Sequence, residues 1–171
     1  MEIALLNPNS IRIKGKQGSI IVNPAQKVPE ANGFIVFGGA KIDHAKVNEG
    51  SVIISGPGEY EFSGIKVTGV KNGNETAYSI RVDRVEILLG IASVLEKEYS
   101  KLQEHNLVLL YTDAIVDASF VTSLATNIIM LYGEKAEETF RNFAKDGYKT
   151  ETKYSVTYDK LPLEVEKILL Q

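Results

Sequence analysis

Two histidines and no cysteine restrict the metal-binding and nucleophilic chemistry that this chain can perform. His44 and His105 are the only histidines in 171 residues, and histidine and cysteine supply most protein zinc ligands. His44 closes the run Gly38-Gly39-Ala40-Lys41-Ile42-Asp43-His44, which follows an apolar segment. An Asp-His pair in this position resembles the last third of a metal-binding loop whose other ligands are missing.

Paired carboxylates offer a second kind of chemistry. Glu59 and Glu61 lie on one face of a predicted strand, where two carboxylates can act as general acid and base. Asp113 and Asp117 flank a predicted strand-to-helix junction. A solvated strand face or a turn hydrogen bond explains the first pair, and helix capping explains Asp117 in the second pair. We therefore expect structural roles for both pairs.

A catalytic serine would need one of the two histidines as its base. His105 stands at the end of a predicted amphipathic helix, where a cation interacts favourably with the helix dipole. We therefore expect His105 to cap that helix at the surface. His44, with Asp43 or Glu59 beside it, is an alternative as a metal-free base, but no spacing singles out a serine as its nucleophile.

Composition restricts the partners and the location. The net charge is -3 and the pI is near 5.5. The sequence has no cluster of Lys and Arg residues, so we do not expect nucleic acid as a partner. The sequence shows neither a long apolar span nor a charged-then-apolar leader, so we do not expect a membrane segment. The absence of cysteine fits a reducing compartment, so we expect a cytoplasmic protein.

The first half of the chain has the pattern of short strands joined by tight turns. Alternating or β-branched runs are separated by glycine, proline and asparagine, which favours hairpins. The predicted strands are 3–6, 10–13, 19–22, 34–37, 52–55, 60–62, 65–70, 77–82 and 85–89.

The second half alternates helices with strands. Leu95, Tyr99 and Leu102 share one helical face, which predicts a helix over 94–105. Further along, the pattern predicts a short helix capped by Asp117 and a longer one over 134–145. The predicted strands of this half are 107–111, 128–132, 154–158 and 165–170.

This order of elements predicts an α+β fold in one domain over residues 1–171, with helices packed outside layers of sheet. Several segments resemble the metallo-β-lactamase-fold superfamily, most closely its small branch of L-ascorbate-6-phosphate lactonase-like hydrolases. The resemblance implies a four-layer αββα sandwich. The segments that carry it include Ile11-Arg12-Ile13, Ser19-Ile20-Ile21-Val22-Asn23-Pro24, Gly56-Pro57-Gly58-Glu59-Tyr60-Glu61 and Gly64-Ile65-Lys66-Val67-Thr68-Gly69.

The resemblance also implies a loop H-x-H-x-D-H and later His and Asp ligands, which together hold one or two zinc ions and activate a water for hydrolysis. Aligning Asp43-His44 with the end of this loop places Gly39 and Lys41 at its first two histidines. Gly39 has no side chain, and the ammonium of Lys41 repels a dication. Both of these implied ligands are lost.

The other implied ligands are also replaced. The family's bridging aspartate falls at Ile91, and its late histidine falls at Tyr132 or Gly133. The first Gly-His falls at Asn7-Pro8, and Asn23 stands where an aspartate precedes proline. None of these residues replaces a zinc ligand, so we expect no dinuclear zinc site and no cofactor.

Asp43 and His44 are accordingly interpreted as vestigial. Capping of a helical turn by Asp43 is the favoured explanation for this residue. A mononuclear site that adds one more carboxylate to Asp43 and His44 is the alternative, although so few fixed ligands bind metal poorly without supporting groups.

Two functions follow as hypotheses. The favoured one is a non-catalytic pseudo-hydrolase that uses the altered pocket or a sheet edge to bind a protein partner or to form a homo-oligomer. The alternative is a hydrolase of esters, lactones or phosphoesters with a mononuclear or metal-free site built from Asp43, His44, Glu59 and Lys41. The single brief helix predicted between Tyr111 and Ile128 favours self-association, because less of the sheet is covered.

Overall fold

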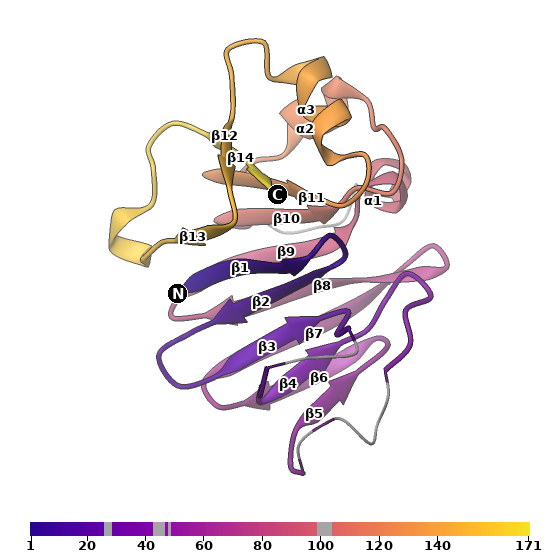
Figure 1. The fold of residues 1–171 in the computed structure, drawn as a ribbon, viewed down its shortest axis with the longest axis vertical. Coiled ribbons are helices and arrows are strands. Elements are labelled where there is room, and N and C mark those ends of the chain that lie inside the picture. Colours follow the sequence, from indigo (N-terminus) through magenta and orange to yellow (C-terminus); the bar gives the residue numbers. More distant parts are fainter. Residues whose placement is uncertain (26–28, 43–46, 48, 99–103) are drawn as a thin grey trace.

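The computed structural model of the chain describes residues 1–171 except 26–28, 43–46, 48 and 99–103. Two sheets form its centre (Figure 1). The six-stranded sheet has the order β13-β1-β2-β3-β4-β5. Its strands are β1 (Glu2–Asn7), β2 (Ser10–Lys14), β3 (Ser19–Val22), β4 (Gly33–Ile35), β5 (Val52–Ile54) and β13 (Lys153–Ser155).

The eight-stranded sheet has the order β12-β14-β11-β10-β9-β8-β7-β6. Strands β6 to β9 form antiparallel hairpins, whereas β9, β10, β11 and β14 run parallel. Its strands are β6 (Gly58–Phe62), β7 (Ile65–Asn72), β8 (Glu75–Val82), β9 (Val85–Ile91), β10 (Leu107–Tyr111), β11 (Ile128–Tyr132), β12 (Lys149–Glu151) and β14 (Glu166–Leu170).

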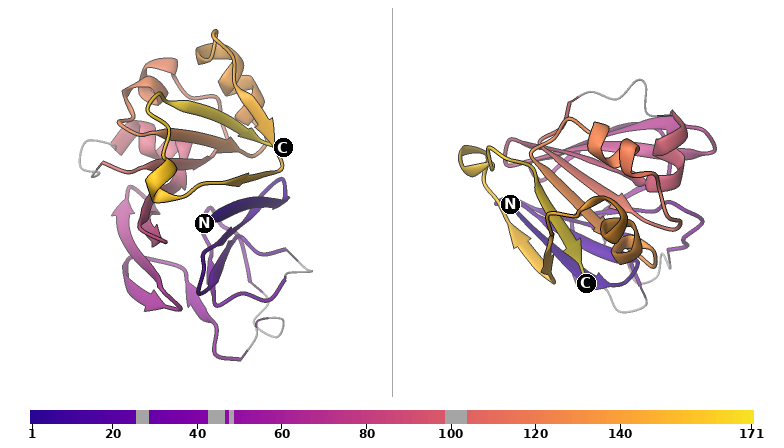
Figure 2. Two further views of the ribbon diagram at one scale, coloured as in Figure 1. Left: turned by 90° about the vertical axis from the view of Figure 1, so that its left-hand side faces the viewer. Right: turned by 90° about the horizontal axis from the view of Figure 1, so that it is seen from above.

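The two sheets pack face to face, as the side view shows (Figure 2). Successive side chains of a strand point to opposite faces. In β10, Leu107 and Leu109 therefore join the core between the sheets, whereas Val108 and Leu110 join the core beneath the helices. This use of both faces explains why β10 and β11 are continuous apolar runs.

Three short α-helices and one 3₁₀ helix are present in the described part of the chain. They are α1 (Ala92–Glu98), α2 (Ala118–Ser123), α3 (Ala136–Phe143) and η3 (Tyr158–Lys160). Residues of α1, α2 and α3 pack on the outer face of the eight-stranded sheet through a second apolar cluster that includes Leu95, Phe120 and Phe140. The α+β class predicted from the sequence is confirmed.

The outer face of the six-stranded sheet has a different cover. Ile21, Ala31 and Phe34 form a small buried cluster, against which Ile42 and Val47 pack. Among the described residues this layer is irregular chain and contains no helix. The helical fourth layer of the expected sandwich is therefore not seen in the part of the chain that the structure describes.

Several predicted elements differ in extent. The helix expected over 94–105 begins at Ala92, is described as far as Glu98, and does not include His105. Tyr158, expected at the end of a strand, lies in η3. The exposed strand β12 was not predicted, because Lys149, Thr150 and Glu151 carry no apolar alternation.

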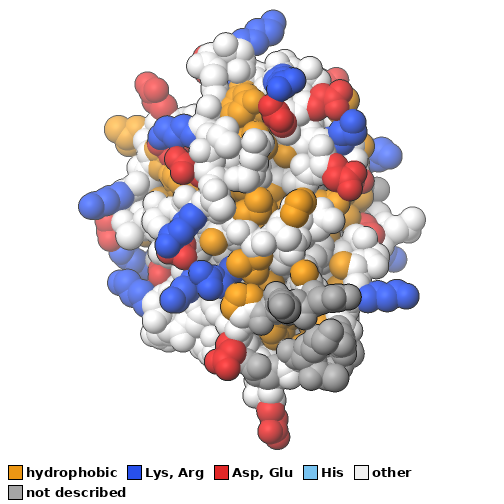
Figure 3. All heavy atoms as spheres, in the orientation of Figure 1, with side chains coloured by type: hydrophobic (Ala, Val, Ile, Leu, Met, Phe, Trp, Pro, Cys, Tyr) orange, Lys and Arg blue, Asp and Glu red, His pale blue; other side chains and the backbone are white. Residues whose placement is uncertain are grey.

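The surface carries both signs of charge. On the face shown in Figure 3, acidic and basic side chains are interspersed around the rim, and hydrophobic side chains show between them. No helix within the described residues is long and apolar enough to span a bilayer.

Candidate functional site at the carboxyl ends of the central strands

Three neighbouring strands of the eight-stranded sheet end in one row of side chains. Strands β9, β10 and β11 are parallel, and Ile91 pairs in register with Tyr111, which pairs with Tyr132. Because the carboxyl ends of parallel strands meet at one edge, this edge is where ligands commonly bind in such sheets. The two positions where the sequence places lost metal ligands, Ile91 and Tyr132, therefore lie in the same row, with Tyr111 between them.

Aromatic side chains fill the space beside this row. The ring centroids of Tyr111 and Tyr132 are 5.5 Å apart. Phe37 follows β4 of the six-stranded sheet. Its ring centroid lies 6.5 Å from that of Tyr111 and 6.4 Å from that of Tyr78. Ile91 packs in the same apolar core as Phe37. Apolar and aromatic contacts thus join the segment after β4 to the ends of the central strands.

Two side chains fix the backbone of the segment that begins at Phe37. The side-chain oxygen of Asn23 accepts a hydrogen bond from the Phe37 amide at 3.0 Å. A carboxylate oxygen of Glu75 accepts one from the Gly38 amide at 3.1 Å. Asn23 adopts a φ of 47°, a conformation that asparagine tolerates better than most residues. Asn23 therefore has a structural role where the family resemblance implies an aspartate.

Gly133 allows the chain to turn immediately after Tyr132. Its φ is +103°, and a Cβ on it would lie 2.8 Å from an atom of the Tyr111 ring. Both the backbone conformation and the close ring contact require glycine here. The ring of Tyr111 is consequently held against the start of the turn.

The two tyrosines are neutral phenols in this setting. Tyr132 is fully buried, its hydroxyl has no hydrogen-bond partner among the described residues, and burial raises its pKa above the ordinary range. The pKa of Tyr111 is raised by burial and then by the charges of Glu134 and Asp113. Neutral phenols can donate or accept hydrogen bonds but are poor general bases at neutral pH.

A polar pair lies near the same edge. The hydroxyl of Ser93, in the first turn of α1, donates to both carboxylate oxygens of Asp113 at 2.9 and 3.1 Å. Asp117 caps α2 by accepting from the Ser119 amide at 2.9 Å, which lowers its pKa. The expected capping role of Asp117 is confirmed, and Asp113 is an exposed partner of Ser93.

The candidate residues of the metal loop are only partly described. Asp43 and His44 lie outside the described residues, as does the capping role expected for Asp43. Lys41 is described and exposed. Glu59 lies on β6 and is exposed, with Tyr60 on the opposite, core-facing side of the strand. The solvated strand face expected for Glu59 and Glu61 is confirmed.

The residues described at the implied ligand positions do not fit a dinuclear zinc site. Gly39 offers no side chain, Lys41 offers a cation, and Ile91 offers a hydrocarbon, whereas zinc is bound by thiolate, imidazole or carboxylate groups. Within the described residues, no group of three or more His, Asp or Glu side chains is placed to hold a metal ion.

His105 is not the surface helix cap that the sequence predicted. It is 7% exposed, and its Nε2 lies 3.0 Å from the Ser79 hydroxyl on β8. The prediction was wrong because the helix does not extend to His105, so this residue packs against the sheet. No local sequence signal links Ser79 to His105, since their contact depends on how the chain returns over β8.

The fold is that of the metallo-β-lactamase-like class. No family model matches the sequence, and no curated protein matches it. Solved structures do match. A Thermotoga maritima protein described as a zinc-dependent hydrolase of the metallo-β-lactamase superfamily superposes with a TM-score of 0.73 and 17% identity, over 99% of this chain and 98% of that one.

A second likeness involves a larger protein. The diiron β-hydroxylase CmlA from Streptomyces venezuelae matches with a TM-score of 0.51 and 9% identity, over 78% of this chain and 45% of that one. A variant of CmlA matches with a TM-score of 0.57 over 99% of this chain and 52% of that one. This chain therefore spans about half of CmlA. At these identities the likenesses establish the fold, and the expected metallo-β-lactamase-like fold is confirmed.

Proposed function

We propose that this chain is a metallo-β-lactamase-fold protein that acts by binding at the strand-end edge, without dinuclear zinc chemistry. One observation carries the proposal. The row where metal ligands would be expected consists of Ile91, Tyr111 and Tyr132, packed with Phe37. Ile91, Phe37 and Tyr132 are buried and Tyr111 is half-buried, so Tyr111 is the member of this row that an apolar or aromatic group of a ligand or protein partner would contact first.

The hydrogen-bonding groups at this edge add selectivity. The Tyr132 hydroxyl, which is buried and has no hydrogen-bond partner among the described residues, lies on the strand next to that of the half-buried Tyr111. A buried hydroxyl without a partner carries a free-energy cost that a ligand group can remove by hydrogen bonding. We therefore propose an occupant that combines an aromatic or apolar body with one hydrogen-bonding atom.

Metal content tests the proposal directly. Protein purified without added metal should contain well below one equivalent of zinc when measured by elemental analysis. Zinc bound tightly at one or more equivalents would overturn it. A Tyr111→Ala variant provides the second arm, because binding of aromatic fragments monitored by NMR should weaken in this variant and persist in a distant surface variant, Arg84→Gln.

The second candidate is a hydrolase with a mononuclear or metal-free site. The comparisons favour this function more directly than the first, since one protein that superposes over 99% of this chain is described as a hydrolase. Its residues would come from Asp43, His44, Lys41 and Glu59. Lys41 would hold an anionic substrate group, and His44 would act as the base.

An activity screen separates the two candidates. Phosphoester, lactone and thioester substrates should be turned over by a hydrolase, and the rate should fall at least about a hundredfold in His44→Ala if His44 is the base. No turnover, or turnover that is indifferent to His44→Ala, counts against the hydrolase and favours the binding protein.

The remaining expectations from the sequence stay proposals. We propose descent from the lactonase-like branch, a cytoplasmic location, no zinc or other cofactor, and partners that are proteins or a second copy of the chain rather than nucleic acid or membrane. The scarcity of ligand residues and the acidic composition support them.

A further inference from the structure

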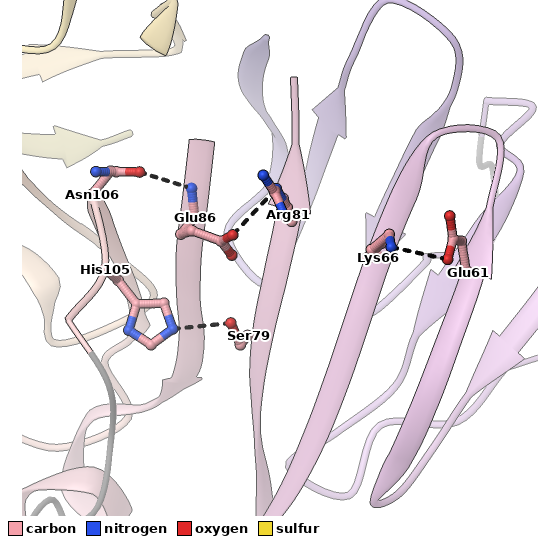
Figure 4. Close-up of polar contacts among 7 residues, drawn as sticks. All are labelled: Glu61, Lys66, Ser79, Arg81, Glu86, His105 and Asn106. Atoms are coloured by element: carbon pink, nitrogen blue, oxygen red, sulfur yellow. Dashed lines mark hydrogen bonds and ion pairs between the residues drawn. The ribbon is translucent and has the colours of Figure 1, made fainter. Parts of the chain in front are cut away.

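A row of four charged side chains crosses the outer face of the eight-stranded sheet, away from the strand-end edge (Figure 4). Glu61 on β6 pairs in register with Lys66 on β7, Lys66 with Arg81 on β8, and Arg81 with Glu86 on β9. The row therefore has two cations in the middle and a carboxylate at each end.

The two central cations, Lys66 and Arg81, lie directly opposite each other on neighbouring strands. Like charges directly opposite each other on neighbouring strands destabilise a sheet. Lys66 lies 3.3 Å from Glu61, and Arg81 lies 3.3 Å from Glu86. With side chains 59% and 54% exposed, Lys66 and Arg81 form surface pairs that stabilise little and exchange readily for another anion.

Polar groups that can donate hydrogen bonds lie in the next row of the same face. Thr68 on β7 pairs in register with Ser79 on β8. The Ser79 hydroxyl is 3.0 Å from Nε2 of His105, which is largely buried. Asn106 accepts a hydrogen bond from the Glu86 amide at 3.0 Å, and this bond fixes the segment that carries His105 against β9.

These donors surround one hollow. A cavity of about 300 Å³ is lined by Lys66, Thr68, Ser79, Arg81, Glu86, Glu104 and His105. Its volume is at the lower end of small-molecule sites. An ammonium, a guanidinium, two hydroxyls and an imidazole thus line, together with two carboxylates, a space too small for a macromolecule.

We propose that this cavity binds the phosphoryl group of a small phosphate monoester. A phosphoryl group has three terminal oxygens and therefore matches donors that approach from several directions, and Arg81 can bind two of these oxygens at once. The carboxylates of Glu86 and Glu104 repel further negative charge, so the site favours one phosphoryl group over a polyanion. This site is independent of the proposed binding edge.

The two histidines make the proposal measurable by NMR at fixed pH and ionic strength. The imidazole signals of His105 are identified as those that persist in His44→Ala. Titration with phenyl phosphate, and separately with inorganic phosphate, should shift them in a saturable manner. Chloride at the same ionic strength should not. A larger affinity for phenyl phosphate than for inorganic phosphate would indicate that the cavity also contacts the ester group.

Charge-removing variants provide the decisive comparison. Arg81→Gln and Lys66→Gln should each weaken phosphate binding by about tenfold or more, the factor expected from the loss of a charge-assisted hydrogen bond. Arg84→Gln is the matched control, because Arg84 is also exposed and forms an ion pair with Asp159. The affinity of the Arg84→Gln variant for phosphate should equal that of the unmodified chain. Absence of a saturable shift, the same shift with chloride, or unchanged binding in both Arg81→Gln and Lys66→Gln would overturn the proposal.

Discussion

The close contact between the Tyr111 ring and Gly133 leaves no room for a side chain at position 133. Gly133 and Gly147 have nearly the same φ, +103° and +102°, yet a Cβ would meet the Tyr111 ring at Gly133 and nothing within 4 Å at Gly147. Substitution by alanine therefore adds the same backbone strain at both positions but adds a steric clash at only one. The pair separates these two effects.

We expect Gly133→Ala to lower the free energy of unfolding by about 1–3 kcal/mol more than Gly147→Ala does, because displacement of a packed ring is added to the backbone cost. Urea denaturation of both variants measures the difference. Equal losses in the two variants would mean that Tyr111 moves aside without cost.

At the residue scale, the family resemblance names the positions where ligands are expected, and only the structure shows which residues lie beside them. The resemblance implies altered ligand positions at Ile91 and at Tyr132 or Gly133. In the structure, Ile91 and Tyr132 pair in register with Tyr111, which lies on the strand between them. Tyr111 carried no signal of its own, because its role depends on strand register. The contact of Ser79 with His105 was missed for the same reason, since it joins residues 26 positions apart.

At the element scale, Glu166 connects strands of the two sheets. Its carboxylate accepts from the Tyr154 hydroxyl of β13 at 2.5 Å and pairs with Lys149 of β12 at 2.7 Å. The hydrogen bond from Lys149, followed by that from Tyr154, lowers the pKa of Glu166 below its ordinary value of 4.5. The charged form of Glu166 therefore stabilises the folded chain.

This lowered pKa sets the direction of a pH effect. The stabilisation is fully present above the ordinary pKa of Glu166 and is lost as the pH falls through the lower pKa of the folded state. We expect Glu166→Gln to lower the free energy of unfolding by about 1–2 kcal/mol at pH 7 and to have little effect near about pH 3.

Denaturation of Glu166→Gln at both pH values checks this expectation. Asp159→Asn is the control, since Asp159 forms an exposed ion pair and its loss should change stability little at either pH. A loss in Glu166→Gln that is equally large at low pH would assign the effect to packing rather than charge.

Element prediction succeeded where apolar periodicity was strong. Ser19–Val22, Leu107–Tyr111 and Ile128–Tyr132 match the predicted strands, because these strands are buried on both faces or closely packed. Short exposed pieces such as β12 were missed, since their sheet pairing comes from backbone hydrogen bonds that any polar sequence can make. The order of strands in the two sheets likewise follows from long-range packing that local patterns do not encode.

At the scale of the whole molecule, self-association is the remaining prediction. The expected brief helix between Tyr111 and Ile128 is α2, only 6 residues long. Edge strands β5 and β6 offer backbone groups for pairing with a second copy.

Light scattering over a range of protein concentrations tests self-association. We expect the apparent mass to rise from one toward two chains as the concentration increases, and charge introduced on edge strand β5 by Ile53→Lys should shift this transition to higher concentration. The apparent mass of a single chain at all concentrations would contradict the prediction.

The aromatic contacts among Phe37, Tyr111 and Tyr132 also bear on whether the folding equilibrium depends on a metal ion. Where a metal ion joins distant segments, its binding free energy contributes to folding, and the folded population follows the supply of the ion. Here rings carried by the chain itself join the segment after β4 to the strand ends. We therefore expect a folding equilibrium that is insensitive to chelators and to metal starvation.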